Sequence, residues 1–110
     1  MSTPQDIALK DAVKGINMFK KVNVPLLGMV QNMSTFSCPN CGHSTHIFGS
    51  EGVAKKCQDL GIALLGDIPL HANICADADR GKPTIVAEPD SDRAKAYEGI
   101  ARTVAGLVGL

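Results

Sequence analysis

The sequence is poor in aromatic residues, with no tryptophan, one tyrosine and three phenylalanines among 110 residues. Apolar residues nevertheless make up 45% of the chain, which is typical of a packed globular protein rather than a disordered one. A chain of this length can enclose one hydrophobic core but not two. We therefore expect a single small domain whose core consists mainly of aliphatic side chains.

The chain also lacks net charge and long apolar runs. Eleven Lys and Arg residues balance eleven Asp and Glu residues, and no basic cluster stands out. Because proteins that bind nucleic acid need clustered cations to neutralise phosphates, this composition disfavours such a role. No apolar run approaches the roughly 20 residues of a membrane span, and residues 1–6 lack the apolar stretch of a secretory signal. The sequence predicts no membrane span.

Four cysteines in a chain without a signal peptide favour thiols or metal ligands over a disulfide framework. Cys57 falls in a helical pattern and Cys75 in an apolar one. Free cysteine is among the most frequently buried residue types. We expect both side chains to be ordinary buried residues.

The other two cysteines, Cys38 and Cys41, belong to the motif Cys-Pro-Asn-Cys-Gly-His in a loop that follows an apolar strand. Two thiolates on one tight turn can bind one side of a zinc ion or an iron–sulfur cluster, and both usually take four ligands. The remaining ligands would come from His43 and His46, from distant cysteines, or from a second copy of the chain.

Apolar periodicity predicts alternating helices and strands. The expected helices cover residues 6–20, 51–60, 72–79 and 92–107, with Asp6, Ser50 and Ser91 as N-caps and Gly61 at the end of the second. The expected strands cover residues 26–30, 62–68 and 84–87, and residues 1–4 resemble the tail of another. This order predicts an α/β fold, with a parallel sheet of three or four strands and flanking helices.

Five segments carry a specific resemblance to a known family, and they cover residues 2–9, 24–34, 38–42, 47–49 and 65–70. In this order they resemble the C-terminal half of the Mrp-type iron–sulfur carrier ATPases, a branch of the MinD/ParA-like P-loop proteins with a Rossmann-like fold. The resemblance is closest to the mitochondrial branch, which includes nucleotide-binding-protein-like assembly factors of respiratory complex I.

The resemblance implies that Cys38 and Cys41 bind a labile [4Fe–4S] cluster shared between two subunits of a homodimer. The cluster would then pass to recipient apoproteins, among them subunits of complex I. The implied location is the mitochondrial matrix, whereas a bacterial relative with the same motifs would be cytoplasmic. A two-fold axis beside the loop would supply the four thiolates.

The resemblance also implies an ATP site. In the intact family the residue matching Asn32 hydrogen-bonds the adenine edge, and the segment matching Pro69, Leu70 and His71 lies against the base. An amide can pair bidentately with adenine. The alternative is that Asn32 only caps the end of its strand.

The phosphate-binding motif G-x-x-x-x-G-K-[ST] is absent from the sequence. The nearest match, around Gly81 and Lys82, has Ala76 in place of the first glycine and Pro83 in place of Ser or Thr. We therefore expect residues 1–110 to form the C-terminal half of a carrier domain that does not hydrolyse ATP by itself. Without neighbouring strands, such a half would expose an apolar sheet edge and dimerise or exchange elements.

Other interpretations of the motif remain open. Zinc bound by Cys38, Cys41, His43 and His46 in one chain would use ligands much closer together than those of a zinc finger. Zinc could instead bridge the cysteines of two chains, which would make the protein a dimerisation module with a structural knuckle. A thiol redox protein is the third alternative, although the residues after Cys41 are poor helix formers.

Overall fold

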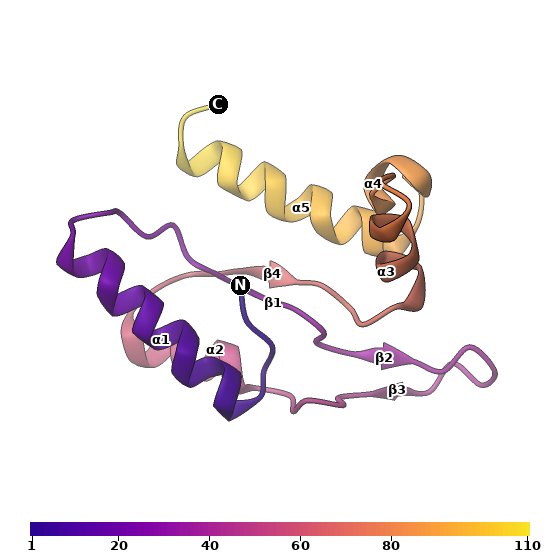
Figure 1. The fold of residues 1–110 in the computed structure, drawn as a ribbon, viewed down its shortest axis with the longest axis horizontal. Helices are drawn as coiled ribbons and strands as arrows, with labels where there is room; N and C mark the ends of the chain where they lie inside the picture. The colour runs from indigo at the N-terminus through magenta and orange to yellow at the C-terminus, as the bar shows by residue number, and fades with distance from the viewer.

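The computed structural model describes all residues from Met1 to Leu110, and Figure 1 shows how its helices and strands are arranged. The helices are α1 (Asp6–Lys21), α2 (Gly52–Leu60), α3 (Ala72–Asp79), α4 (Thr84–Ala87) and α5 (Asp92–Leu107). The strands are β1 (Met29–Gln31), β2 (Phe36–Ser37), β3 (Ser44–Thr45) and β4 (Leu64–Asp67).

The central sheet is parallel, as predicted. Strands β1 and β4 pair with Val30 opposite Gly66 and Gln31 opposite Asp67. On the other side of β1, Ser2 forms a parallel bridge with Gln31. The Ser2 N–H donates to the Val30 carbonyl at 2.9 Å. Residues 1–4 therefore continue the sheet at its edge, as the resemblance to a strand tail predicts.

Helices lie on both sides of the β1–β4 pair (Figure 1). On one side, α1 and α2 pack over β1 and bury a single aliphatic cluster that consists of Leu9, Ile16, Met29, Val53 and Cys57. On the other side α5 packs so closely on β4 that a Cβ at Gly66 would lie 2.6 Å from Ile100 Cγ1. This arrangement confirms the predicted α/β fold class with flanking helices.

One predicted strand is wrong. Residues 84–87 form the short helix α4, in which Val86 N–H and Ala87 N–H both donate to the Pro83 carbonyl. Thr84 is buried, and its hydroxyl donates to Asp77 Oδ2 at 2.8 Å. β-Branched residues favour strands only where a neighbouring strand can pair with them, and here the contacts of α4 are with α3 and α5. The sheet therefore contains β1, β4 and the bridged Ser2.

The predicted helix ends are partly confirmed. Ser91 caps α5, because its hydroxyl accepts the Ala94 N–H at 3.2 Å, and Gly61 ends α2 with a left-handed φ of 68°. The caps predicted at Asp6 and Ser50 are wrong. The N-cap of α1 is Gln5, one residue before Asp6, and the N-cap of α2 is Glu51, one residue after Ser50. Neither side chain accepts a capping hydrogen bond.

Predictions about burial are also partly confirmed. Cys57 is buried, as expected, whereas Cys75 is exposed on α3 with its sulfur 3.7 Å from Asp79 Oδ2, so its predicted burial is wrong. Helix α5 is fully buried only near its start, at Ala94, and Leu107 near its end is 54% exposed. None of the helices is both long and apolar enough to cross a bilayer.

Candidate functional site

The Cys-Pro-Asn-Cys motif, which was expected in a loop, lies at the tip of a β-hairpin formed by β2 and β3. Phe36 pairs with Thr45 and Ser37 with Ser44 in an antiparallel register. Beyond them, the Cys38 N–H donates to the His43 carbonyl at 2.9 Å. Figure 1 shows this hairpin projecting from the body of the molecule.

The turn closes tightly around Cys38. The Gly42 N–H donates to the Cys38 carbonyl at 2.8 Å, and Gly42 has a φ of 72°, a value that residues with a side chain rarely adopt. Cys38 is partly exposed and Cys41 is exposed. The motif thus presents two thiols at the end of a protruding element, where a metal centre could be bound and released.

The turn also favours the thiolate form of Cys38. Backbone N–H groups of Cys41 and Asn40 donate to the Cys38 sulfur, as does the Cys41 side chain, and together they lower the pKa of Cys38 below its usual 9.0. Thiolate is the form that binds soft metals and attacks electrophiles. The donor set therefore suits a thiolate-bound cluster or zinc ion.

Alkylation should reveal this difference in acidity. We expect iodoacetamide to label Cys38 with a midpoint below pH 9.0, because its thiolate accepts backbone N–H bonds. Burial raises the pKa of Cys57, so that thiol should react only at higher pH and more slowly. Mass spectrometry of peptides labelled at a series of pH values gives both curves. A Cys38 midpoint at or above that of Cys57 would contradict the assigned hydrogen bonds.

The two nearby histidines do not join the thiols in this structure. His46 Nδ1 lies 3.1 Å from the Ser34 carbonyl oxygen, and because a carbonyl can only accept, Nδ1 carries the proton in this bond. His43 is exposed. Within one chain, no three His, Cys, Asp or Glu side chains are grouped so that they could bind a metal ion. A single chain therefore presents Cys38 and Cys41 as a pair.

The residues predicted to contact adenine lie at one edge of the central sheet. Strands β1 and β4 end there side by side, and the Ile68 N–H donates to the Gln31 carbonyl at 2.8 Å. Asn32 follows β1, and its Oδ1 accepts the Met33 N–H at 2.9 Å. The segment Pro69–His71 follows β4; its first two residues are half-buried and His71 is exposed.

Ser34 and Thr35 connect this edge to the hairpin. Ser34 is buried, and both its N–H and its hydroxyl donate to the Ile68 carbonyl, at 3.0 and 3.2 Å. The Leu70 N–H donates to the Thr35 carbonyl at 2.8 Å. The segment that precedes Cys38 is thus bonded directly to the segment predicted to lie against the base. The sequence gives little sign of this link beyond a polar pair, Ser34 and Thr35, shortly after a buried strand.

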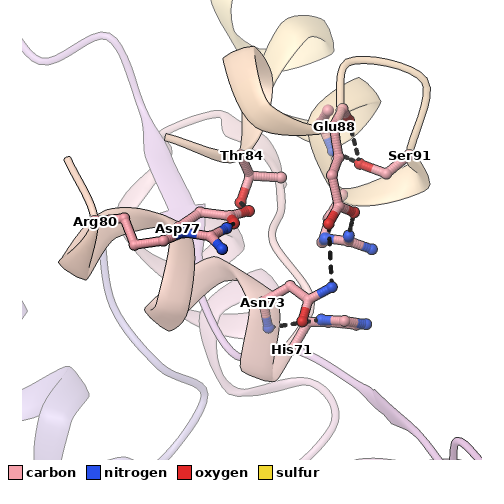
Figure 2. A network of polar contacts seen from close by, with 9 residues as sticks. His71, Asn73, Asp77, Arg80, Thr84, Glu88 and Ser91 are labelled. Atoms are coloured by element: carbon pink, nitrogen blue, oxygen red, sulfur yellow. Dashed lines mark hydrogen bonds and ion pairs between the residues drawn. The ribbon is translucent and has the colours of Figure 1, made fainter. Parts of the chain in front are cut away.

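A second network holds His71 at the start of α3 (Figure 2). The His71 Nδ1 accepts the Asn73 N–H at 3.0 Å and so caps the helix. Asn73 Nδ2 donates to Glu88 Oε1 at 3.2 Å, and Glu88 also pairs with Arg93 of α5. Apart from His71, no sequence motif indicated these residues, because they come from three different helices and their connections.

Known proteins similar to this chain point to one family. The family model described as ParA, NUBPL iron-transfer P-loop NTPase, matches residues 1–105. The mouse iron-sulfur cluster transfer protein NUBPL is 58% identical over 94% of this chain and 33% of its own length. A mitochondrial iron-sulfur protein of Arabidopsis thaliana, described as required for NADH dehydrogenase, is 48% identical over 94% of this chain and 33% of its own length. The chain thus spans about a third of these relatives.

Two solved structures share the fold. The cell division ATPase MinD of Pyrococcus furiosus aligns with 97% of this chain over 41% of its own length. The TM-score is 0.75 and the sequence identity is 25%. A nucleotide-binding protein from Archaeoglobus fulgidus, in complex with ADP, aligns with 84% of this chain over 37% of its own length. The TM-score is 0.66 and the sequence identity is 31%. With the family match over nearly all of its residues, the chain belongs to the ParA family of P-loop NTPases, in its NUBPL iron-transfer group.

Proposed function

We propose that this chain binds an iron–sulfur cluster and passes it to other proteins, as the metal-binding part of an ATP-dependent carrier. The observation that carries the proposal is the thiol pair Cys38 and Cys41 at the tip of a projecting hairpin, with Cys38 acidified by backbone N–H groups. The names of the relatives, an iron-sulfur cluster transfer protein among them, support the same role.

The cluster we propose is a [4Fe–4S] cluster shared by two copies of the chain. Such a cluster takes four thiolates, and each chain offers two at one tip. A two-fold axis at the hairpins would bring two pairs together in an isologous contact. Exposed apolar side chains, among them Ile7, Val22 and Val86, favour further association of the copies. A cluster bound only at such tips would be weakly retained, which suits a carrier.

The nucleotide part of the proposal rests on the sheet edge. Asn32 would pair with the adenine edge, while Pro69, Leu70 and His71 would lie against the base. The ADP complex of the Archaeoglobus fulgidus neighbour supports a nucleotide as ligand. Because the sequence has no G-x-x-x-x-G-K-[ST] motif, we propose that residues 1–110 contribute base contacts and do not hydrolyse ATP alone.

Nucleotide binding would reach the hairpin through Ser34. We expect ADP to shift the backbone NMR signals of Cys38 and Cys41, although neither residue contacts the base. Replacing Ser34 with alanine removes the hydroxyl bond to Ile68, so these remote shifts should fall by about half while those of Asn32 remain. Equal remote shifts in the Ser34→Ala variant would contradict a route through Ser34.

The relatives' names support a proposal for the recipients and the location. We propose that the recipients are iron–sulfur apoproteins that include subunits of respiratory complex I, since one relative is required for NADH dehydrogenase and is mitochondrial by name. The proposed location is accordingly the mitochondrial matrix, with the bacterial cytoplasm as the alternative for a bacterial chain.

Anaerobic reconstitution with iron and sulfide tests the proposed function. We expect a brown sample with broad visible absorption that fades in oxygen and contains about four irons per two chains. A colourless product that binds only zinc would support the dimerisation module with a structural knuckle, and chelation would then unfold it. A reversible Cys38–Cys41 disulfide that forms without any metal, with no cluster, would instead support a thiol redox protein.

A further inference from the structure

Glu88 connects three helices through one carboxylate (Figure 2). Its Oε1 accepts the side-chain N–H of Asn73, in the first turn of α3, at 3.2 Å, and Oε2 pairs with Arg93 of α5. Its backbone is fixed as well, because its N–H donates to the Thr84 carbonyl and its carbonyl accepts the Ser91 hydroxyl at 2.7 Å. The carboxylate therefore has a defined position at the end of α4.

Arg93 keeps the carboxylate in place. The Arg93 side chain is 13% exposed and the Glu88 side chain 39%, so this ion pair is only partly open to water. The Nε atom of Arg93 is buried without a hydrogen-bond partner, which leaves Glu88 as the group that balances its charge. Turning Glu88 away would leave a largely buried guanidinium unpaired, a costly change.

The backbone N–H of Asn73 in turn determines which nitrogen of the His71 ring carries the proton. Because the Asn73 N–H donates to Nδ1 of His71, that nitrogen must be the unprotonated acceptor, and the neutral ring carries its proton on Nε2. His71 is exposed, so this Nε2–H group is free to donate to a ligand. A purine offers ring nitrogens that accept such a bond.

We propose that Glu88 is a positioning residue for the nucleotide base. By orienting Asn73 it holds the His71 ring with Nε2–H as a hydrogen-bond donor for a ring nitrogen of the purine. The inference rests on the proposed contact between the base and the segment Pro69–His71. Glu88 itself does not touch the nucleotide; it acts through Asn73 and His71.

An exchange of the two side chains distinguishes this role from general stability. Replacing Asn73 with aspartate places a carboxylate against that of Glu88, and the repulsion should turn the first residues of α3 away. Adding Glu88→Gln restores the hydrogen bond in the opposite direction, because the amide introduced at position 88 donates to the carboxylate introduced at position 73. The amide oxygen at position 88 still accepts from Arg93. Glu98→Gln is the matched control, because Glu98 pairs with Arg102 elsewhere on α5.

Two readouts apply to each variant of the full chain. Nitrogen-15 NMR of the His71 ring shows which nitrogen carries the proton in the free protein, and titration with ADP gives a dissociation constant, on the order of 1 mM for base contacts alone. We expect Asn73→Asp to abolish the single-tautomer signature and weaken ADP binding about fivefold. The Asn73→Asp/Glu88→Gln variant should restore both to within about twofold, and Glu98→Gln should change neither.

Three results would overturn the inference, and they differ from one another. If Asn73→Asp leaves the tautomer and the ADP affinity unchanged, or the exchanged pair restores neither while remaining folded by circular dichroism, Glu88 does not position His71. If the tautomer follows the exchange but ADP shifts no signal even in the unsubstituted chain, the proposed base contact itself is wrong.

Discussion

Replacing either Cys38 or Cys41 with alanine is expected to abolish cluster binding. Each substitution leaves a dimer with two thiolates where a [4Fe–4S] cluster takes four. We expect the iron and sulfide content after reconstitution to fall below about a tenth of that of the unsubstituted chain. The loss should be chemical rather than structural, because the bonds that close the turn join the backbone of Cys38 to His43 and Gly42.

Cys75→Ala is the control for this prediction. Cys75 is exposed like Cys41, but it lies on α3 and not on the hairpin. Its replacement should leave the iron content and the visible absorption unchanged. A cluster that survives Cys38→Ala, or one that is lost in Cys75→Ala, would contradict the assignment of the ligands.

The second large effect concerns stability and is expected at Gly52. A Cβ at this position would lie 2.2 Å from the Pro4 carbonyl oxygen and 2.9 Å from Leu9 Cδ1. Pro4 leads from the sheet edge into α1 and Leu9 is 2% exposed, so neither neighbour can move without displacing α1. We expect Gly52→Ala to lower the free energy of unfolding by about 3 kcal/mol.

The control is another glycine-to-alanine change in a helix. A Cβ at Gly99 of α5 would meet no atom within 4 Å, so Gly99→Ala should stabilise the chain by about 0.5–1 kcal/mol through helix propensity. Urea unfolding followed by circular dichroism measures both variants. If Gly52→Ala unfolds at the same urea concentration as the unsubstituted chain, the close packing of α1 and α2 is wrong.

Local sequence patterns predicted most of the helices but not the contacts between distant residues. The range 72–79 is the observed range of α3, because Pro69 precedes it and Gly81 and Pro83 end its pattern. The run at 84–87 looks like a strand by composition, but no strand lies beside it. The hairpin around Cys38 was missed because its strands have two residues each, too short for an alternating pattern.

The candidate site was predictable where chemistry is concentrated in a short motif. Cys38 and Cys41 are proposed from their spacing, and Asn32 is proposed from the family resemblance together with its place at the end of a strand. Ser34 and Glu88 could not be found in this way, because their partners Ile68 and Asn73 lie 34 and 15 positions away. Only the folded chain brings these pairs together.

Native mass spectrometry of the anaerobically reconstituted chain tests the central claim most directly, because it weighs protein and cluster together. The account predicts one species that contains two chains and a single [4Fe–4S] cluster, and that loses the cluster when the sample is oxidised. A cluster carried by one chain alone, or a two-chain species that contains zinc and does not accept iron and sulfide, would contradict it.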